Sequence, residues 1–184
     1  MRLEHIPNLI TLGRIAMVGP IVWYLVNEDY GVAFLLFLVA GASDALDGQL
    51  AKRLGWESRL GGLLDPAADK LLLVAGFLCL GWLDALPGWL VALVILRDLV
   101  IVAGAATYHW RVAPLEVDPM YISKVNTVLQ IALVLVAIAE RAWAAVPPVL
   151  SQLLVVAVAA TTIASGAAYV IEWSRRAANP ARRG

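Results

Sequence analysis

Six long apolar segments, separated by short polar or proline-containing turns, dominate this sequence of 184 residues. A helix needs about 20 mostly apolar residues to cross the hydrocarbon core of a bilayer, and each segment is close to that length. The sequence is 61% hydrophobic, whereas soluble domains are about 45–50% apolar. It therefore predicts one all-α integral membrane domain over residues 1–184, with six transmembrane helices at roughly 9–27, 31–52, 63–83, 88–109, 121–142 and 147–173.

Positively charged side chains gather on one side of these segments. If the N-terminus is cytoplasmic, Arg141 is the single basic residue in the outer loops, whereas nine lie in the inner loops and termini. Because cytoplasmic loops carry an excess of lysine and arginine, both termini are predicted to be cytoplasmic, in a membrane of the bacterial inner-membrane type. Residues 3–12 are predicted to form a short interfacial helix before the first span. The formal net charge of zero gives no indication of a nucleic-acid partner.

Four aspartates, Asp44, Asp47, Asp65 and Asp69, lie within 26 residues of this apolar sequence. Aspartate at bilayer depth costs at least about 2.5 kcal/mol, so four of them need a common physical reason. The first two are spaced i,i+3 and the last two i,i+4, so on helices each pair projects from one face. Two such helices facing each other would bring four carboxylates into one pocket, and hard oxygen ligands suit Mg²⁺ or Mn²⁺ rather than zinc. The alternative is a set of four solvated loop aspartates.

The same stretch resembles the signature of the CDP-alcohol phosphatidyltransferases, D-x2-D-G-x2-A-R-x8-G-x3-D-x3-D. The single departure is Lys52, where the family usually has arginine. Lysine keeps the charge but loses the planar fork that grips phosphate through two hydrogen bonds, which affects the detail of a diphosphate contact rather than the class of reaction. The residues that fall on the signature without a gap are Asp44, Asp47, Gly48, Ala51, Gly61, Asp65 and Asp69.

This resemblance implies an enzyme that transfers a phosphatidyl group from CDP-diacylglycerol to an alcohol and releases CMP. It also implies two divalent cations, Mg²⁺ or Mn²⁺, held by the four aspartates, with Asp69 acting in addition as the general base, and a homodimer surrounded by membrane lipid. Small residues beside the aspartates would let a nucleotide approach the helix backbone, although they could instead ease helix packing. The residues expected to contact the CDP-lipid are Asn8, Gly48, Ala51, Lys52, Ser58 and Gly61.

Further charged residues within the apolar segments are candidates for the acceptor site. Arg97 lies in the middle of the fourth segment beside Asp98, and Lys124 lies at the start of the fifth. A buried arginine and a lysine that converge near the aspartates would bind the phosphate of an acceptor, and Arg14 on the first segment fits the same role. The alternative is that Arg97 neutralises an aspartate for structural reasons.

A polar stripe on the fifth segment, formed by Asn126 and Gln130 with Ser123 nearby, is predicted to form hydrogen bonds between helices rather than to carry chemistry. Tryptophans near the predicted helix ends are expected to be interfacial anchors; they are Trp82, Trp89, Trp143 and Trp173.

The acceptor alcohol is less well determined than the reaction. The R-D pair in the fourth segment, the following Y-H-W-R and the stretch Y-I-S-K-V-N-T-V-L-Q resemble CMP-forming cardiolipin synthases, which favours phosphatidylglycerol as the acceptor. The N-terminal I-P-N-L-I-T-L-G-R suits those enzymes and the phosphatidylglycerophosphate synthases alike, so glycerol 3-phosphate is the alternative.

Two functions of other classes also use clustered intramembrane carboxylates. An intramembrane prenyltransferase binds a diphosphate through Mg²⁺, but its aspartate motifs are expected to be spread over a longer chain. An ion transporter would use the carboxylates as a relay, yet residues 90–184 contain no repeat of the aspartate pattern of the kind that such folds often show.

Overall fold

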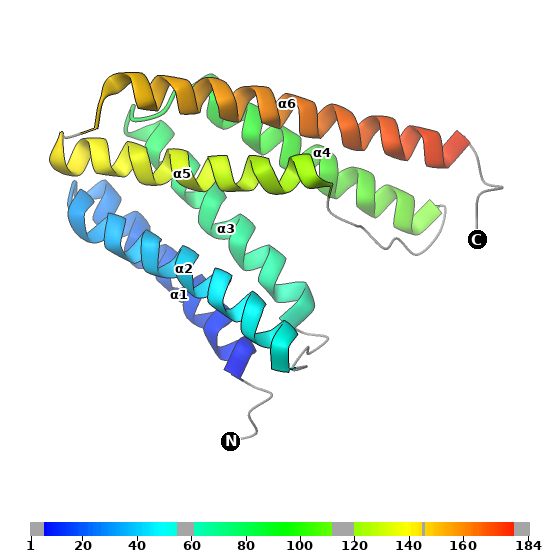
Figure 1. Cartoon of the computed structure of the whole chain (residues 1–184), viewed down its shortest axis with the longest axis horizontal. Helices are drawn as coiled ribbons and strands as arrows, with labels where there is room; N and C mark the ends of the chain where they lie inside the picture. Colours follow the sequence, from blue (N-terminus) through cyan, green and yellow to red (C-terminus); the bar gives the residue numbers. More distant parts are fainter. Residues whose placement is uncertain (1–5, 55–60, 112–119, 145, 179–184) are drawn as a thin grey trace. The chain divides into compact units, whose positions relative to one another are not determined.

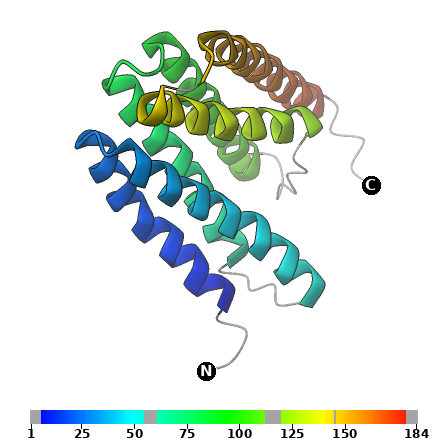
Figure 2. The same ribbon diagram turned by 60° about the vertical axis from the view of Figure 1, so that its left-hand side comes forward.

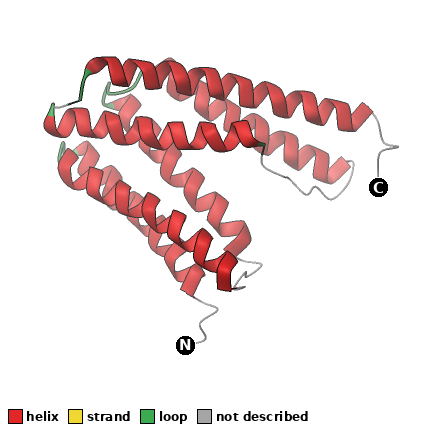
Figure 3. Cartoon of the chain, in the orientation of Figure 1, coloured by secondary structure: helices red, strands yellow, loops and turns green. Residues whose placement is uncertain are grey.

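The computed structural model describes the backbone of residues 6–54, 61–111, 120–144 and 146–178, and the side chains of residues 12–43, 70–104, 120–144 and 146–175. All regular structure in these ranges is helical (Figure 3). The helices are shown in chain order in Figure 1 and are α1 (Ile6–Val26), α2 (Tyr30–Leu54), α3 (Gly61–Trp82), α4 (Gly88–Arg111), α5 (Tyr121–Trp143) and α6 (Pro148–Ala178).

The prediction of six helices is confirmed within the described residues, and their ends agree with the expected ranges to within a few residues. Among these residues, Tyr121–Trp143 and Pro148–Arg175 are long and apolar enough to cross a membrane, with mean hydropathies of 1.9 and 2.0. Shorter apolar helical stretches are Leu12–Val26, Tyr30–Ser43 and Lys70–Trp82. Six transmembrane spans and cytoplasmic termini stay predictions.

The expected separate interfacial helix over residues 3–12 is corrected by the structure. From Ile6 onward the chain forms one continuous helix that ends at Val26. Pro7 does not interrupt α1 because it lies in the first turn, where the missing N–H group would have had no partner inside the helix.

A tight turn joins α1 to α2. Glu28 adopts a left-handed conformation with φ of 62°, its N–H donates to the carbonyl of Leu25, and the N–H of Asp29 donates to the carbonyl of Tyr24 at 2.9 Å. This pair of bonds is the Schellman arrangement that ends many helices. Asp29 then accepts a hydrogen bond from the N–H of Val32 at 3.4 Å and so caps the start of α2. The two helices are therefore antiparallel neighbours.

The described helices belong to two compact units. Unit 1 contains Met1–Pro87 and Val134–Pro148, and unit 2 contains Gly88–Leu133 and Val149–Gly184. The last part of α5 therefore belongs to unit 1, and its first part belongs to unit 2.

Among the described side chains of unit 1, the buried ones are apolar except for Arg14. Within this unit α1 packs against both α2 and α3, and Figure 2 shows α1 and α2 side by side. The fully buried side chains include Leu25, Phe37, Phe77 and Leu80, together with the charged Arg14.

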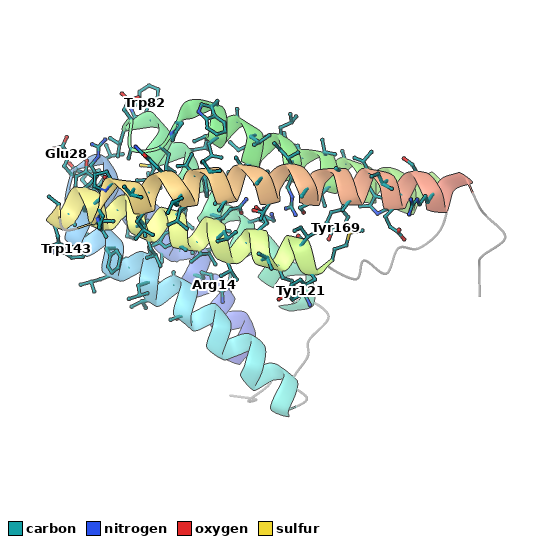
Figure 4. The ribbon with its side chains drawn as sticks, turned by 45° about the horizontal axis from the view of Figure 1, so that its top comes forward. Arg14, Glu28, Trp82, Tyr121, Trp143 and Tyr169 are labelled. Atoms are coloured by element: carbon teal, nitrogen blue, oxygen red, sulfur yellow. The ribbon has the colours of Figure 1, made fainter. Side chains whose placement is uncertain are left out.

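The end of unit 1 that carries Glu28 and Trp143 (Figure 4) is held by side-chain contacts. The ring of Trp143 lies edge-on to Phe34 at 5.1 Å. Arg141, the single base predicted for the outer loops, donates a hydrogen bond to the carbonyl of Leu83 at 2.9 Å. Arg141 is thus an exception to the predicted distribution of basic residues that has a structural explanation. This side chain connects the end of α5 to the turn after α3.

Unit 2 contrasts with unit 1 because several of its buried described side chains are polar or charged, alongside apolar ones such as Leu90, Val94 and Leu133. Arg97, Asn126, Gln130, Thr162 and Ser165 are all 6% exposed or less. The pairing of α5 with α6 is antiparallel: the hydroxyl of Thr162 donates to Asn126 Oδ1 at 2.9 Å, and, further along in the opposite sense, the N–H of Met120 donates to the Tyr169 hydroxyl.

Candidate functional site

The four signature aspartates lie on two consecutive helices of unit 1. Asp44 and Asp47 are in the last half of α2, and Asp65 and Asp69 are in the first half of α3. The helical backbone confirms the setting in which each pair shares one face. The structure does not describe these four side chains, so their convergence in one pocket stays a prediction.

The register of α2 against α3 supports that prediction. A Cβ atom added at Gly76 would lie 3.2 Å from the ring of Phe37, so this side chain of α2 reaches the backbone of α3 there. Asp44 follows Phe37 by seven residues and Asp69 precedes Gly76 by seven. At about 1.5 Å per residue, both aspartates lie about 10 Å from this contact along their helices. Because the chain reverses between α2 and α3, this places Asp44 and Asp69 at the same level of unit 1.

The remaining donor-site candidates lie outside the described side chains. Asn8 is in the first turn of α1, Gly61 is the first residue of α3, and Ser58 falls outside the described residues. The others are on α2, after Asp47; they are Gly48, Ala51 and Lys52.

Arg14 is buried in unit 1, with a relative exposure of 1%. It lies twelve residues before the end of α1, and residue 42 lies twelve residues after the start of α2. Since α1 and α2 are antiparallel and joined by a tight turn, Arg14 is level with the residues just before Asp44. Arg14 therefore lies within about one helical turn of the level of Asp44.

Arg97 is the centre of a hydrogen-bonded cluster in unit 2. Its Nη1 donates to Asp98 Oδ1 at 2.7 Å, and the two side chains are 5% and 12% exposed. Its Nη2 donates to Ser123 Oγ at 2.7 Å and to Ser165 Oγ at 2.5 Å. The guanidinium carbon lies 6.0 Å from the centre of the Tyr169 ring. The arginine therefore joins α4 to both α5 and α6.

Lys124 follows Ser123 directly on α5, and its side chain is exposed. The structure thus brings Arg97 to the turn of α5 that carries Lys124, although Lys124 itself is not buried. Arg14 belongs to the other unit.

The polar stripe on α5 forms hydrogen bonds between helices, as the sequence predicted. Asn126 Oδ1 accepts from the hydroxyls of Thr161 and Thr162 on α6. Sequence reasoning missed the α6 residues in this seam, although Thr162, Ser165 and Tyr169 are spaced i, i+3 and i+7 and so share one face of an apolar helix.

The donor chemistry of the signature suits a divalent cation. Its four potential ligands are carboxylates, which provide the hard oxygens that Mg²⁺ and Mn²⁺ prefer. Among the side chains that the structure describes, no three histidine, cysteine, aspartate or glutamate residues come together; the signature aspartates lie outside these side chains and stay the candidate ligands that the sequence predicts.

Comparison with known proteins gives a family match and relatives of two kinds. Residues 4–166 match the model of the CDP-alcohol phosphatidyltransferase family. The chain is 38% identical to CDP-diacylglycerol–glycerol-3-phosphate 3-phosphatidyltransferase 1, chloroplastic, of Oryza sativa subsp. japonica, over 94% of this chain and 58% of that protein. It is 33% identical to the CMP-forming cardiolipin synthase of Rattus norvegicus, over 89% and 60%. It is 35% identical to that of Streptomyces coelicolor, over 59% and 54%. The chain therefore spans less than two thirds of the length of each of these relatives.

Proposed function

The chain belongs to the CDP-alcohol phosphatidyltransferase family, and on this premise we propose that it transfers a phosphatidyl group from CDP-diacylglycerol to an alcohol and releases CMP. The observation that carries the proposal is the family match over residues 4–166 together with the complete aspartate signature, which lies on α2 and α3. The contact between Phe37 and Gly76 supports a common level for Asp44 and Asp69. A random set of loop aspartates would not share this register.

In the proposed reaction the acceptor hydroxyl attacks the phosphorus that carries the diacylglycerol group. The new oxygen–phosphorus bond forms as the bond to the CMP phosphate breaks, and the electron pair leaves with CMP. Asp69 accepts the proton of the attacking hydroxyl as general base. Divalent cations bound by Asp44, Asp47, Asp65 and Asp69 would neutralise phosphate oxygens and the leaving group. Gly48, Ala51 and Gly61 leave room for the nucleotide close to the helix backbones, while Asn8 and Ser58 contact the CDP moiety.

Lys52 provides a test of the donor site. Lys52→Ala is expected to raise the KM for CDP-diacylglycerol roughly tenfold, because a charge-assisted contact to phosphate is lost. Lys52→Arg keeps the charge and restores the fork usual in the family, so it should retain activity. The measurement is CMP release against CDP-diacylglycerol concentration, and an unchanged KM in the alanine variant would remove Lys52 from the site.

We favour phosphatidylglycerol as the acceptor, which makes the product cardiolipin. Arg97 is paired with Asp98, so part of its positive charge is already offset, which suits an acceptor with one negative charge better than a dianionic phosphate. In this proposal Arg97, Lys124 and Arg14 bind the acceptor. Glycerol 3-phosphate is the second candidate, because the rice relative is named for it.

The acceptor is tested by CMP release from CDP-diacylglycerol by purified protein in detergent with Mg²⁺ or Mn²⁺. Phosphatidylglycerol and glycerol 3-phosphate are supplied in parallel, and the expected result is metal-dependent CMP with phosphatidylglycerol. CMP with glycerol 3-phosphate alone would reverse the choice of acceptor. Release of pyrophosphate from a polyprenyl diphosphate, with no CMP from CDP-diacylglycerol, would contradict the proposed reaction.

The proposed setting is an integral membrane enzyme with six spans, in a membrane of the bacterial inner-membrane type. The distribution of basic residues along the sequence supports cytoplasmic termini and an active site at the cytoplasmic side. A homodimer is part of the proposal by family resemblance.

A further inference from the structure

Arg97 uses both of its Nη groups in the described cluster, but its Nε–H group is not engaged there. Nη1 is engaged by Asp98, and Nη2 is engaged by Ser123 and Ser165. The Nε–H group is buried and has no hydrogen-bond partner among the described atoms. Buried donors are nearly always paired, so this N–H group is a donor that an oxygen of a bound ligand would satisfy.

The surroundings of Arg97 on α6 fix the side chain in one position. Ser165 is 0% exposed and makes the shortest contact to the guanidinium. A Cβ at the adjacent Gly166 would lie 3.6 Å from Arg97 Cγ, so the arginine stem runs against this part of α6. One turn further, the ring of Tyr169 lies beside the guanidinium, and its hydroxyl accepts the N–H of Met120, just before α5. Figure 4 shows Tyr169 and Tyr121 near the same end of α5.

We infer that Ser165 is a positioning residue: its hydroxyl holds the Arg97 guanidinium in the orientation that presents Nε–H to an oxygen of the acceptor. Ser165 thereby raises acceptor affinity without touching the acceptor, an inference that rests on the proposed role of Arg97. The physical reason is preorganisation, because arginine has many rotamers and fixing them in advance removes that cost from binding. Asp98 cannot do this alone, since it lies next to Arg97 on the same helix and engages only Nη1.

Ser165→Ala is expected to raise the KM for phosphatidylglycerol about three- to tenfold, the cost of immobilising one long side chain. The KM for CDP-diacylglycerol and kcat should stay within about twofold of the wild-type values, a split that general destabilisation would not produce. Ser165→Thr keeps the hydroxyl and should restore acceptor affinity. The Kd of a short-chain phosphatidylglycerol, measured by calorimetry without CDP-diacylglycerol, should follow the same order and does not depend on turnover.

Thr162→Ala is the matched control. It also removes a buried α6 hydroxyl that bonds to α5, but this hydroxyl donates to Asn126 and not to Arg97. An equal effect of Ser165→Ala and Thr162→Ala on the acceptor Kd would reduce Ser165 to helix packing and overturn the inference.

An Arg97→Lys background separates this inference from the proposed function. If Ser165 acts through Arg97, Ser165→Ala should add no further loss of acceptor affinity in that background. Full additivity would overturn the inference while leaving Arg97 as an acceptor ligand. An unchanged acceptor Kd in Arg97→Lys itself would instead remove Arg97 from the acceptor site, and the role of Ser165 would be lost with it.

Discussion

Replacing Asp69 with asparagine is expected to lower metal-dependent CMP release by about 10²–10⁴-fold, the range typical for loss of a positioned general base. Asparagine has nearly the same shape as aspartate, but its amide oxygen cannot take the proton of the attacking hydroxyl. It is also a neutral and weaker ligand for a hard cation. The measurement is kcat for CMP release at saturating CDP-diacylglycerol and acceptor.

The same substitution at the other end of α3 is the control. Asp84 has φ of 52° in the turn after α3, a conformation that asparagine adopts readily, so Asp84→Asn should leave the rate unchanged. Asp65→Asn distinguishes the loss of a metal ligand from the loss of the base. Raising the Mg²⁺ or Mn²⁺ concentration should restore part of the CMP-release rate that Asp65→Asn loses. It should restore little of the rate that Asp69→Asn loses. A variant of Asp69 that kept more than a tenth of the wild-type rate would exclude it as the base.

The helices could be predicted from sequence because each one contains close to the number of apolar residues needed to cross a membrane. Polar or proline-containing turns mark where these segments end. The turn between α1 and α2 formed where Asn27, Glu28 and Asp29 interrupt the apolar pattern. The separate helix expected over residues 3–12 is not observed from Ile6 onward, because Pro7 lies in the first turn of α1, where it does not break the helix. The effect of this proline depends on whether it falls in the first turn or in the interior of a helix, and composition does not reveal where the helix begins.

For the candidate site, too, features set by local spacing could be predicted, whereas features set by packing between helices could not. The aspartates could be found because their spacing is local, within 26 residues on two consecutive helices. The partners of Arg97 could not be found, since Ser123 and Ser165 are 26 and 68 residues away in sequence and meet it only through the packing of three helices. The adjacent Asp98 was visible, and the structure confirms that Arg97 pairs with it while also joining three helices.

Another tertiary contact that the sequence did not indicate is that of Gly104 with Trp173. Trp82, Trp89 and Trp143 are 54–85% exposed, as expected of interfacial anchors. Trp173 differs, because its six-membered ring occupies the space in which a side chain at Gly104 would begin, and it also lies 5.4 Å from the ring of Tyr169. Gly104 therefore allows α4 and α6 to approach closely.

Gly104→Ala is expected to lower the free energy of unfolding by about 1–3 kcal/mol, the usual cost of overpacking. On helix propensity alone the same change would stabilise α4 by up to about 1 kcal/mol, so the sign of the result decides between the two effects. We expect overpacking to prevail, because the added carbon would overlap the Trp173 ring and that ring is also packed against Tyr169. The measurement is unfolding of the purified protein in detergent.

Two further variants connect the loss to the contact itself. Gly13→Ala, on α1 where nothing beyond the helix's own backbone and the adjacent residues lies within 4 Å of the added carbon, should stabilise the protein slightly or leave it unchanged. In a Trp173→Leu background, Gly104→Ala should lose its penalty, because the leucine leaves room for the methyl group; the coupling energy between the two sites should then be about 1–3 kcal/mol. If the penalty were the same with and without the indole, the contact between Gly104 and Trp173 would not be its source. Stabilisation by Gly104→Ala in the wild-type background would mean that α4 and α6 are not in close contact at this level.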